Sequence, residues 1–191
     1  MKADETSPDH AFWMDAGEEL QWVKAARGGK DSAYSRLAER HRPTLFRIVY
    51  AVTRSERGAF EVVEATEERG AKGIRHMPEN QRFLPWWIRI ARNLAVARAR
   101  RLAGSEAGAT PEPPTAVISG RMSPTVAWRL DRALVGLELD DQLVLALRLV
   151  EGLSYAEIER VMMLPQGSVL ARISRARASI EDRLEPREAA A

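Results

Sequence analysis

Polar and basic side chains gather on one side of the segment Gln166–Leu184, close to the C-terminus of this 191-residue chain. Val169, Ile173 and Ile180 recur at helical spacing on the other side of the same segment. Amides, hydroxyls and guanidinium groups in the first turns of such a helix can reach base edges and phosphates in the DNA major groove. The candidate DNA-contacting residues here are Gln166, Ser168, Arg172, Arg175 and Arg177.

A short helix and a turn precede this segment. Ser154 and Glu157 have the spacing of a capping box at the start of a helix Ser154–Met162, and Pro165 then interrupts the helical pattern. A short helix, a tight turn and a longer basic helix are typical of a helix-turn-helix. The alternative at this point is an amphipathic core helix with a solvated basic face.

Charge is distributed unevenly, although the formal net charge is only +2. Basic segments that are separated from an acidic one suit a protein that meets both phosphates and a basic partner. Taken alone, each run more simply fits a solvated helix face. One basic run comprises Arg82, Arg89, Arg92, Arg98, Arg100 and Arg101, and the acidic run comprises Glu61, Glu64, Glu67 and Glu68.

Composition excludes several classes of protein. Hydrophobic residues make up 45% and charged residues 29% of the chain, so it can bury a core and remain soluble. No stretch approaches the roughly 18 apolar residues of a membrane span, and Met1–His10 does not resemble a signal peptide. We therefore expect a cytoplasmic protein with no membrane insertion.

Catalytic chemistry has little support in the sequence. Cysteine is absent, which excludes disulfides, thiolate metal sites and cysteine nucleophiles. His10, His41 and His76 are scattered, and neither a glycine-rich phosphate loop nor metal-ligand spacing occurs. We expect no enzyme, no cofactor and no metal site, and His41 is interpreted as a surface residue.

Helical periodicity predicts an all-α fold with two domains. The first domain, residues 9–102, is a four-helix bundle in which Leu20 and Val23 face inward, Asp31 caps the second helix and Pro43 breaks or kinks it. Its other expected helices are Asp9–Arg27, Gly58–Ile74 and Arg82–Leu102.

The composition changes after residue 102. Residues 103–124 are rich in glycine and proline and poor in large apolar residues, which predicts a flexible linker. Helical periodicity then returns across residues 125–185, the second domain. Its expected helices are Val126–Leu137, Asp140–Val150, Ser154–Met162 and Gln166–Leu184.

Four stretches resemble one known family. Leu143–Val161 and Gly167–Ala178 resemble the fourth region of extracytoplasmic-function (ECF) sigma factors of bacterial RNA polymerase. Tyr34–Pro43 resembles the start of the family's second region, and Phe83–Asn93 resembles its promoter-melting helix. The two halves occur in the family's order and are joined by a linker, so the chain is identified as resembling a divergent member.

The resemblance implies a promoter-specific initiation factor. Its partners would be core RNA polymerase, promoter DNA and, as a further candidate, an anti-sigma factor. The N-terminal bundle would hold the polymerase clamp helices and capture the −10 element, and the helix-turn-helix would dock on the flap and read the −35 element through the candidates named above. The implied −10 residues are Arg82, Trp87, Arg89, Arg92 and Asn93, and the implied polymerase-binding residues are Glu61, Glu64 and Glu68.

Two neighbouring tryptophans leave an ambiguity within that set. A tryptophan ring can stack on an unpaired base, which contributes roughly 1–3 kcal/mol. Aromatic residues at helical spacing more often form core. We assign Trp86 to the core and Trp87 to the DNA.

The sequence departs from the family where function concentrates. In the clamp-binding helix, Glu64, Ala65 and Glu67 stand where the family has Gln, an acid and Phe. In the recognition helix, Leu170 and Ala171 replace a basic residue and a serine. One residue of the helix-turn-helix turn, Met163, takes the place of an expected glycine.

These departures keep two other hypotheses open. The first is a sigma-like regulator that binds DNA or polymerase but no longer initiates transcription. The second is a stand-alone helix-turn-helix repressor, which would need a dimer interface. A repressor should elute from gel filtration as a dimer, and a sigma factor as a monomer or with a partner.

Overall fold

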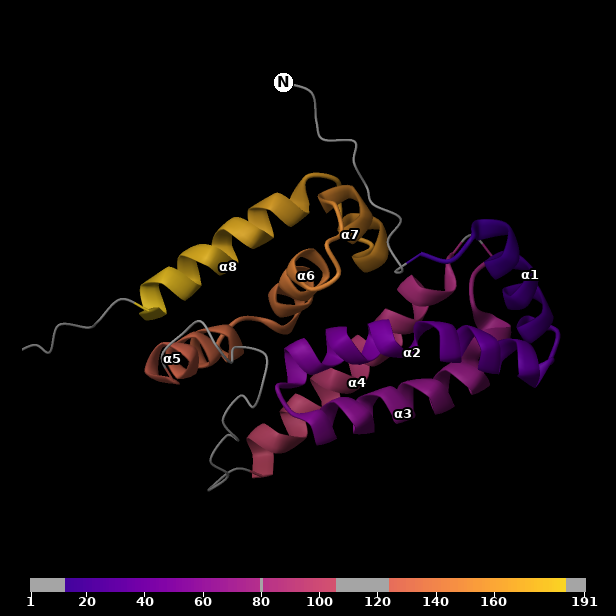
Figure 1. Cartoon of the computed structure of the whole chain (residues 1–191), viewed down its shortest axis with the longest axis horizontal. Helices are drawn as coiled ribbons and strands as arrows, with labels where there is room; N and C mark the ends of the chain where they lie inside the picture. Colours follow the sequence, from indigo (N-terminus) through magenta and orange to yellow (C-terminus); the bar gives the residue numbers. More distant parts are fainter. Residues whose placement is uncertain (1–12, 80, 106–123, 185–191) are drawn as a thin grey trace, which may run out of the picture.

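The computed structural model describes residues 13–79, 81–105 and 124–184, and all regular secondary structure in these ranges is helical. Helices α1 to α4 form one half of the molecule and α5 to α8 the other (Figure 1). The all-helical prediction is confirmed. The elements are α1 (Ala16–Arg27), α2 (Asp31–Thr53), α3 (Glu56–Gly73), the 3₁₀ turn η1 (Ile74–His76), α4 (Phe83–Ser105), α5 (Pro124–Val135), α6 (Leu139–Leu149), α7 (Tyr155–Met162) and α8 (Ser168–Leu184).

The first helix begins later than the periodicity predicted. The Asp15 carboxylate accepts hydrogen bonds from the backbone N–H groups of Gly17 and Glu18, both at 2.9 Å, so α1 starts at Ala16. Residues 9–12 of the predicted helix lie outside the described residues. Val23 is buried as expected, but Leu20 is 46% exposed, so its inward assignment was wrong.

Helix α2 corrects two further predictions. Asp31 is the first helical residue rather than the cap, and Lys30 occupies the N-cap position without a side-chain hydrogen bond. Pro43 lies inside the helix and does not end it. A proline costs a helix one backbone hydrogen bond. That loss is tolerated because α2 packs against four other helices, α1, α3, α4 and α6.

Aromatic side chains fill the centre of the N-terminal half. Phe83 is fully buried, and its ring centroid lies 5.2 Å from that of Trp87 and 5.9 Å from that of Tyr34. Gly70 on α3 makes this packing possible, since a Cβ atom there would lie 2.4 Å from the Tyr34 hydroxyl and 2.8 Å from Trp87 Nε1. Large rings packed at these separations contribute much of the apolar burial that holds α2, α3 and α4 together.

His41 also belongs to this core, which corrects its assignment to the surface. The residue is 1% exposed, and its ring stacks on Phe83 at a centroid separation of 5.8 Å. Burial, followed by the positive charges of Arg40 and Arg82, lowers the pKa of His41 to about 4. The imidazole is therefore neutral at pH 7.

The C-terminal half contains the predicted helix-turn-helix. Ser154 caps α7 in a complete capping box with Glu157, as the spacing predicted. Met163 ends α7 in the left-handed conformation at φ 54°, where a glycine would be unstrained. Because α8 begins at Ser168, Gln166 lies in the turn rather than in the helix.

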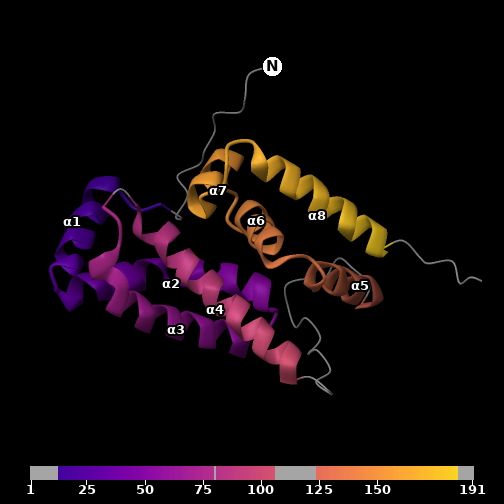
Figure 2. The same ribbon diagram turned by 180° about the vertical axis from the view of Figure 1, so that it is seen from behind.

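The two halves pack against each other. Helix α6 lies against α2, and α7 lies against α4 (Figures 1 and 2). Leu143 of α6 closes over an apolar surface of α2 and α4 that includes Val49 and Ala91. Helix α4 extends to Ser105 and α5 begins at Pro124, so helices take up both ends of the predicted linker, and residues 106–123 lie outside the described part of the chain.

Candidate nucleic-acid interface

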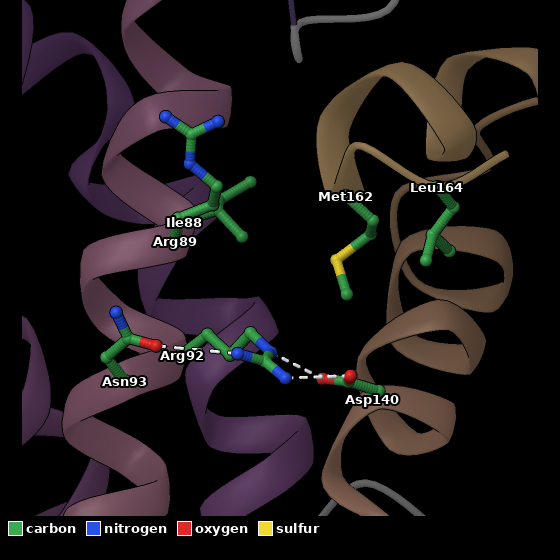
Figure 3. A pocket seen from close by; sticks show the side chains of 7 residues that line it. All are labelled: Ile88, Arg89, Arg92, Asn93, Asp140, Met162 and Leu164. Atoms are coloured by element: carbon green, nitrogen blue, oxygen red, sulfur yellow. Dashed lines mark hydrogen bonds and ion pairs between the residues drawn. The ribbon is translucent and has the colours of Figure 1, made fainter. Parts of the chain in front are cut away.

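A pocket of about 350 Å³ lies between part of α4 and the C-terminal half. Figure 3 shows residues of α4 on one side and residues of α6, α7 and the following turn on the other. Three predicted DNA-contacting residues therefore face the other half of the same chain. The lining residues are Ile88, Arg89, Arg92 and Asn93 from α4, with Asp140, Met162 and Leu164 opposite.

Arg92 reaches across this pocket to Asp140, the second residue of α6 (Figure 3). Its Nη2 donates to Oδ2 at 2.7 Å, and its Nε donates to Oδ1, so the two groups meet through parallel hydrogen bonds. The hydrogen bond from Arg92 lowers the pKa of Asp140, and the same bond raises that of Arg92. Asn93 is exposed, and its Oδ1 accepts only a long 3.4 Å contact from Arg92.

Arg89 has no carboxylate partner among the described residues. Its guanidinium donates to the side-chain oxygen of Gln81 and contacts the sulfur of Met163. Burial lowers the pKa of Arg89, which remains charged at pH 7. Because Arg89 lines the pocket, it is a candidate for binding an anionic group, which would replace its contact with Met163.

Arg82 has a structural environment that the sequence did not reveal. It pairs with Glu19 of α1, a residue only 4% exposed, and its guanidinium lies 4.8 Å from the centre of the Trp13 ring. Glu19 also accepts a 2.6 Å hydrogen bond from the backbone N–H of Phe83. Arg82 thus fastens α1 to the start of α4. Its assignment to DNA stays a prediction, and DNA would have to compete with Glu19 for this guanidinium.

The assignment of Trp86 to the core is confirmed, whereas the burial of Trp87 contradicts its assignment to the DNA. Trp87 is 0% exposed and Trp86 is 8% exposed, so both rings belong to the core. Trp87 cannot stack on a base without unpacking the centre of the N-terminal half. Periodicity could not distinguish two adjacent tryptophans, because a small rotation of the helix exchanges which of them points furthest inward.

The predicted recognition helix presents a more open surface. Gln166, Arg175 and Arg177 are exposed, and Arg177 makes a 2.8 Å ion pair with Glu181 one turn later. Arg172 is held by Asp141 of α6 at 2.9 Å. The remaining candidate, Ser168, is only partly exposed, and its hydroxyl donates to the Pro165 carbonyl at 2.6 Å. Three of the five candidates, Ser168, Arg172 and Arg177, are therefore engaged with their own domain.

Comparison with known proteins supports this arrangement. The family described as "Sigma-70, region 4" matches residues 127–180, which include the helix-turn-helix. The ECF sigma factor SigW of Bacillus subtilis is 24% identical over 184 residues, covering 85% of this chain and 94% of its own. The RNA polymerase sigma-H factor of Pseudomonas aeruginosa is 27% identical over 187 residues, covering 88% of this chain and 95% of its own. Over most of its length the chain is thus similar to ECF sigma factors.

Solved structures agree on the fold. CnrH, in its complex with the cytosolic domain of CnrY, aligns with a TM-score of 0.62 at 22% identity and covers 87% of this chain and 97% of its own. The sigma factor RpoE of Bartonella quintana, crystallised with the anti-sigma factor NepR, aligns with a TM-score of 0.51 at 17% identity and covers 88% of this chain and 94% of its own. The likeness thus extends over both halves.

The acidic residues that the family resemblance assigns to polymerase lie on the outside of α3. Glu61, Glu64 and Glu68 are exposed. The Glu61 carboxylate accepts from Arg98 at 3.2 Å and from Arg57 at 3.1 Å, and these bonds lower its pKa. A 2.6 Å ion pair with Lys72 lowers that of Glu68.

Basic neighbours therefore offset part of the negative charge on the outside of α3. Of the three carboxylates, only Glu64 has no ion pair within the described part of the chain. Any basic partner of this face must compete with Arg57, Arg98 and Lys72 for the other two.

Two long-range ion pairs had no signal in the sequence. Arg47 of α2 donates through two nitrogens to Glu151 after α6, both at 2.8 Å. Arg54 at the end of α2 donates to Asp131 of α5 at 2.7 Å. The partners are 104 and 77 positions apart. Such distant pairs become visible only once the two halves have been placed together.

Neither a metal site nor a membrane span is found in the described ranges. No group of at least three His, Asp or Glu residues is positioned to hold a metal ion there. None of the helices within residues 13–79, 81–105 and 124–184 is long and apolar enough to cross a bilayer.

Proposed function

We propose that this chain is an ECF sigma factor that directs RNA polymerase to specific promoters, acting in the cytoplasm as an initiation factor rather than an enzyme. The observation that carries the proposal is the recognition surface. A capped helix-turn-helix presents Gln166 and Arg175 to solvent within the region that matches sigma-70 region 4. The sigma factors from B. subtilis and P. aeruginosa match this chain over 94% and 95% of their own lengths. A match of that extent supports a single function to which both halves contribute.

The turn before α8 and the exposed side of α8 would enter the major groove of the −35 element. Gln166 can pair with a base edge, and Arg175 can pair with a guanine or a phosphate. Arg172 and Arg177 would add affinity once their carboxylate partners exchange for phosphates, and Ser168 would fix the turn. Leu170 is 54% exposed on this helix and offers only an apolar contact, which favours weak discrimination between bases.

The pocket-facing side of α4 would hold the −10 element. Arg89 and Arg92 carry positive charge toward the pocket, and Asn93 adds an exposed amide. Guanidinium groups bind phosphates in the same parallel two-bond geometry that Arg92 makes with Asp140. We propose these three residues for the single strand, with Arg82 joining them where DNA displaces Glu19 and Trp87 left out.

The outside of α3 would meet the basic surface of the polymerase clamp. Glu64 carries the unpaired charge, and Glu61 and Glu68 would exchange their present partners for those of the polymerase. Charge complementarity of this kind mainly sets association rate and register.

The test is transcription from genomic DNA by core polymerase to which this chain is added. Sequencing the 5′ ends of the transcripts should show starts that depend on the added chain and share upstream elements. Arg175→Ala should reduce those transcripts, and Arg40→Ala, which removes an exposed arginine from α2, should leave them unchanged. A chain that binds core polymerase and yields no specific start would refute the proposal.

That negative outcome describes a second candidate, a sigma-like regulator that no longer initiates. The neutralised acidic side of α3 and the apolar Leu170 favour it, since both lie where sigma factors make productive contacts. Gel filtration at a defined concentration separates both candidates from a stand-alone repressor, which requires a stable dimer.

A further inference from the structure

The outward side of the first two turns of α8 is mostly apolar. Leu170, the third residue of the helix, is 54% exposed, and Ala171 and Ser174 are exposed as well. Positions three or four residues apart lie on the same side of a helix, so these three residues form one strip, the outward strip of α8. The largest side chain of the strip is a leucine, and its one polar side-chain group is the Ser174 hydroxyl.

The polar residues beside the outward strip are held by other parts of the chain. The Arg172 guanidinium pairs with Asp141 of α6 at 2.9 Å. The Ser168 hydroxyl donates to the Pro165 carbonyl at 2.6 Å. Neither group lies in front of Leu170, so a molecule that approaches the start of α8 meets an apolar side chain first.

The approach to this end of α8 is open. Gly167, directly before the helix, has a φ of 79°, a conformation that strains any residue with a Cβ atom. A Cβ atom placed there would meet no heavy atom of the described residues within 4 Å. The fold therefore leaves room for another molecule beside the first turn.

The DNA major groove offers one apolar group, the C5 methyl of thymine, among hydrogen-bond donors and acceptors. The first turns of a recognition helix lie against these base edges. A leucine side chain that covers a donor or an acceptor removes its water and returns no hydrogen bond, which is unfavourable. A leucine that covers a methyl group instead buries two apolar surfaces, which is favourable.

We propose that Leu170 is a specificity-determining residue, which selects −35 elements with a thymine methyl facing the start of α8. This inference rests on the proposed function for the placement of α8 in the major groove. Ala171 widens the apolar contact toward the neighbouring base pair. Arg175, exposed on the same helix, binds a phosphate and adds affinity that does not depend on sequence.

The preference is tested first by selection with the full chain at low salt. Two libraries of random DNA duplexes are used, one with thymine and the other with uracil, which pairs identically and lacks only the C5 methyl group. The thymine library should yield a motif with at least one invariant thymine. The uracil library, or the thymine library with Leu170→Ala, should lose the preference at that position.

The contact is then measured by fluorescence anisotropy on the selected duplex. Uracil in place of the invariant thymine should weaken binding of the parent chain about four-fold, the effect expected for one methyl group. Leu170→Ala should bind the two duplexes equally. With a G·C pair at the same position, 5-methylcytosine should bind the parent chain more tightly than cytosine.

Two further variants serve as controls for this measurement. Leu149→Ala removes a leucine that is 76% exposed at the end of α6, and it should keep the full difference between thymine and uracil. Arg175→Ala should weaken binding to both duplexes by the same factor. Circular dichroism verifies that each variant is folded.

The outcomes separate this inference from the proposed function. An equal effect of uracil on the parent chain and on folded Leu170→Ala would overturn the inference, because the methyl group would then act without this leucine. Selection of no motif, or of the same motif from both libraries, would overturn it as well. A chain that selects a thymine-dependent motif and starts no transcript would refute initiation and leave the inference intact.

Discussion

On α4, Arg92 is paired with Asp140 and Arg89 lies against Met163, whereas on the C-terminal half Gln166 and Arg175 are exposed to solvent. The two proposed DNA surfaces thus differ in the free chain: one faces the rest of the molecule and the other faces water. The difference shows that a basic residue predicted from the sequence to bind DNA need not be free to do so in the folded chain. Its availability depends on which carboxylates the fold places beside it.

The largest expected effect concerns the core beneath the covered surface. Trp87→Ala should lower the free energy of unfolding by roughly 3–5 kcal/mol, because it leaves a cavity beside Phe83 and Tyr34. Tyr155→Ala, at a residue 39% exposed on the C-terminal half, should cost much less. Denaturant unfolding of both variants checks the comparison. A fully stable Trp87→Ala protein with weakened oligonucleotide binding would return this tryptophan to the DNA surface.

The next effect is the pH dependence of stability that the buried His41 gives to the N-terminal half. His41 is buried with neither ring nitrogen hydrogen-bonded in the described structure, and its pKa is lowered from 6.5 to about 4. Between those values the unfolded chain binds more protons than the folded one, so stability present above pH 6.5 is lost as pH falls toward 4. The expected loss between pH 6.5 and 5 is roughly 2 kcal/mol.

His41→Leu provides the control for that prediction. Leucine fills a similar apolar space and cannot be protonated, so the variant should lose this part of the pH dependence. Thermal unfolding followed between pH 5 and 7 measures both proteins. Parallel pH profiles for the parent chain and His41→Leu would show that His41 is not the titrating group.

The smallest effect lies in the helix-turn-helix turn. Met163→Gly should stabilise the protein by up to about 1 kcal/mol, because glycine adopts the left-handed conformation without strain. Met163→Ala keeps the strain and removes the sulfur contact with Arg89, which separates the backbone effect from the side-chain effect. Equal unfolding free energies for the two variants would show that the conformation carries no cost.

Local patterns in the sequence predicted the helices and one cap well. The Ser154–Glu157 spacing gave the capping box, and the family pattern identified Met163 as a position that needs a left-handed residue. In both cases the residues that determine the local conformation lie within a few positions of it in the sequence. Hydrophobic periodicity gave the existence of α2 but not its continuity through Pro43, since packing against four helices decides whether the chain tolerates that proline.

The candidate site was harder to predict because its geometry is non-local. Arg82 looks like any other basic residue of its segment, and only the fold brings Glu19 to it. Trp86 and Trp87 differ by a rotation of α4 that no local pattern determines. The interaction of Arg47 with Glu151 spans 104 positions and depends on how the two halves meet.

Arginine accessibility tests the central comparison most directly. The free chain would be treated with an arginine-selective dicarbonyl at low salt, and modification of each residue followed by mass spectrometry. Arg175 should react several-fold faster than Arg92, and in Asp140→Asn with Glu151→Gln the rate at Arg92 should rise while that at Arg175 stays constant. Equal rates at Arg92 and Arg175 in the parent chain would contradict the account, because the α4 surface would then be as open as the recognition helix.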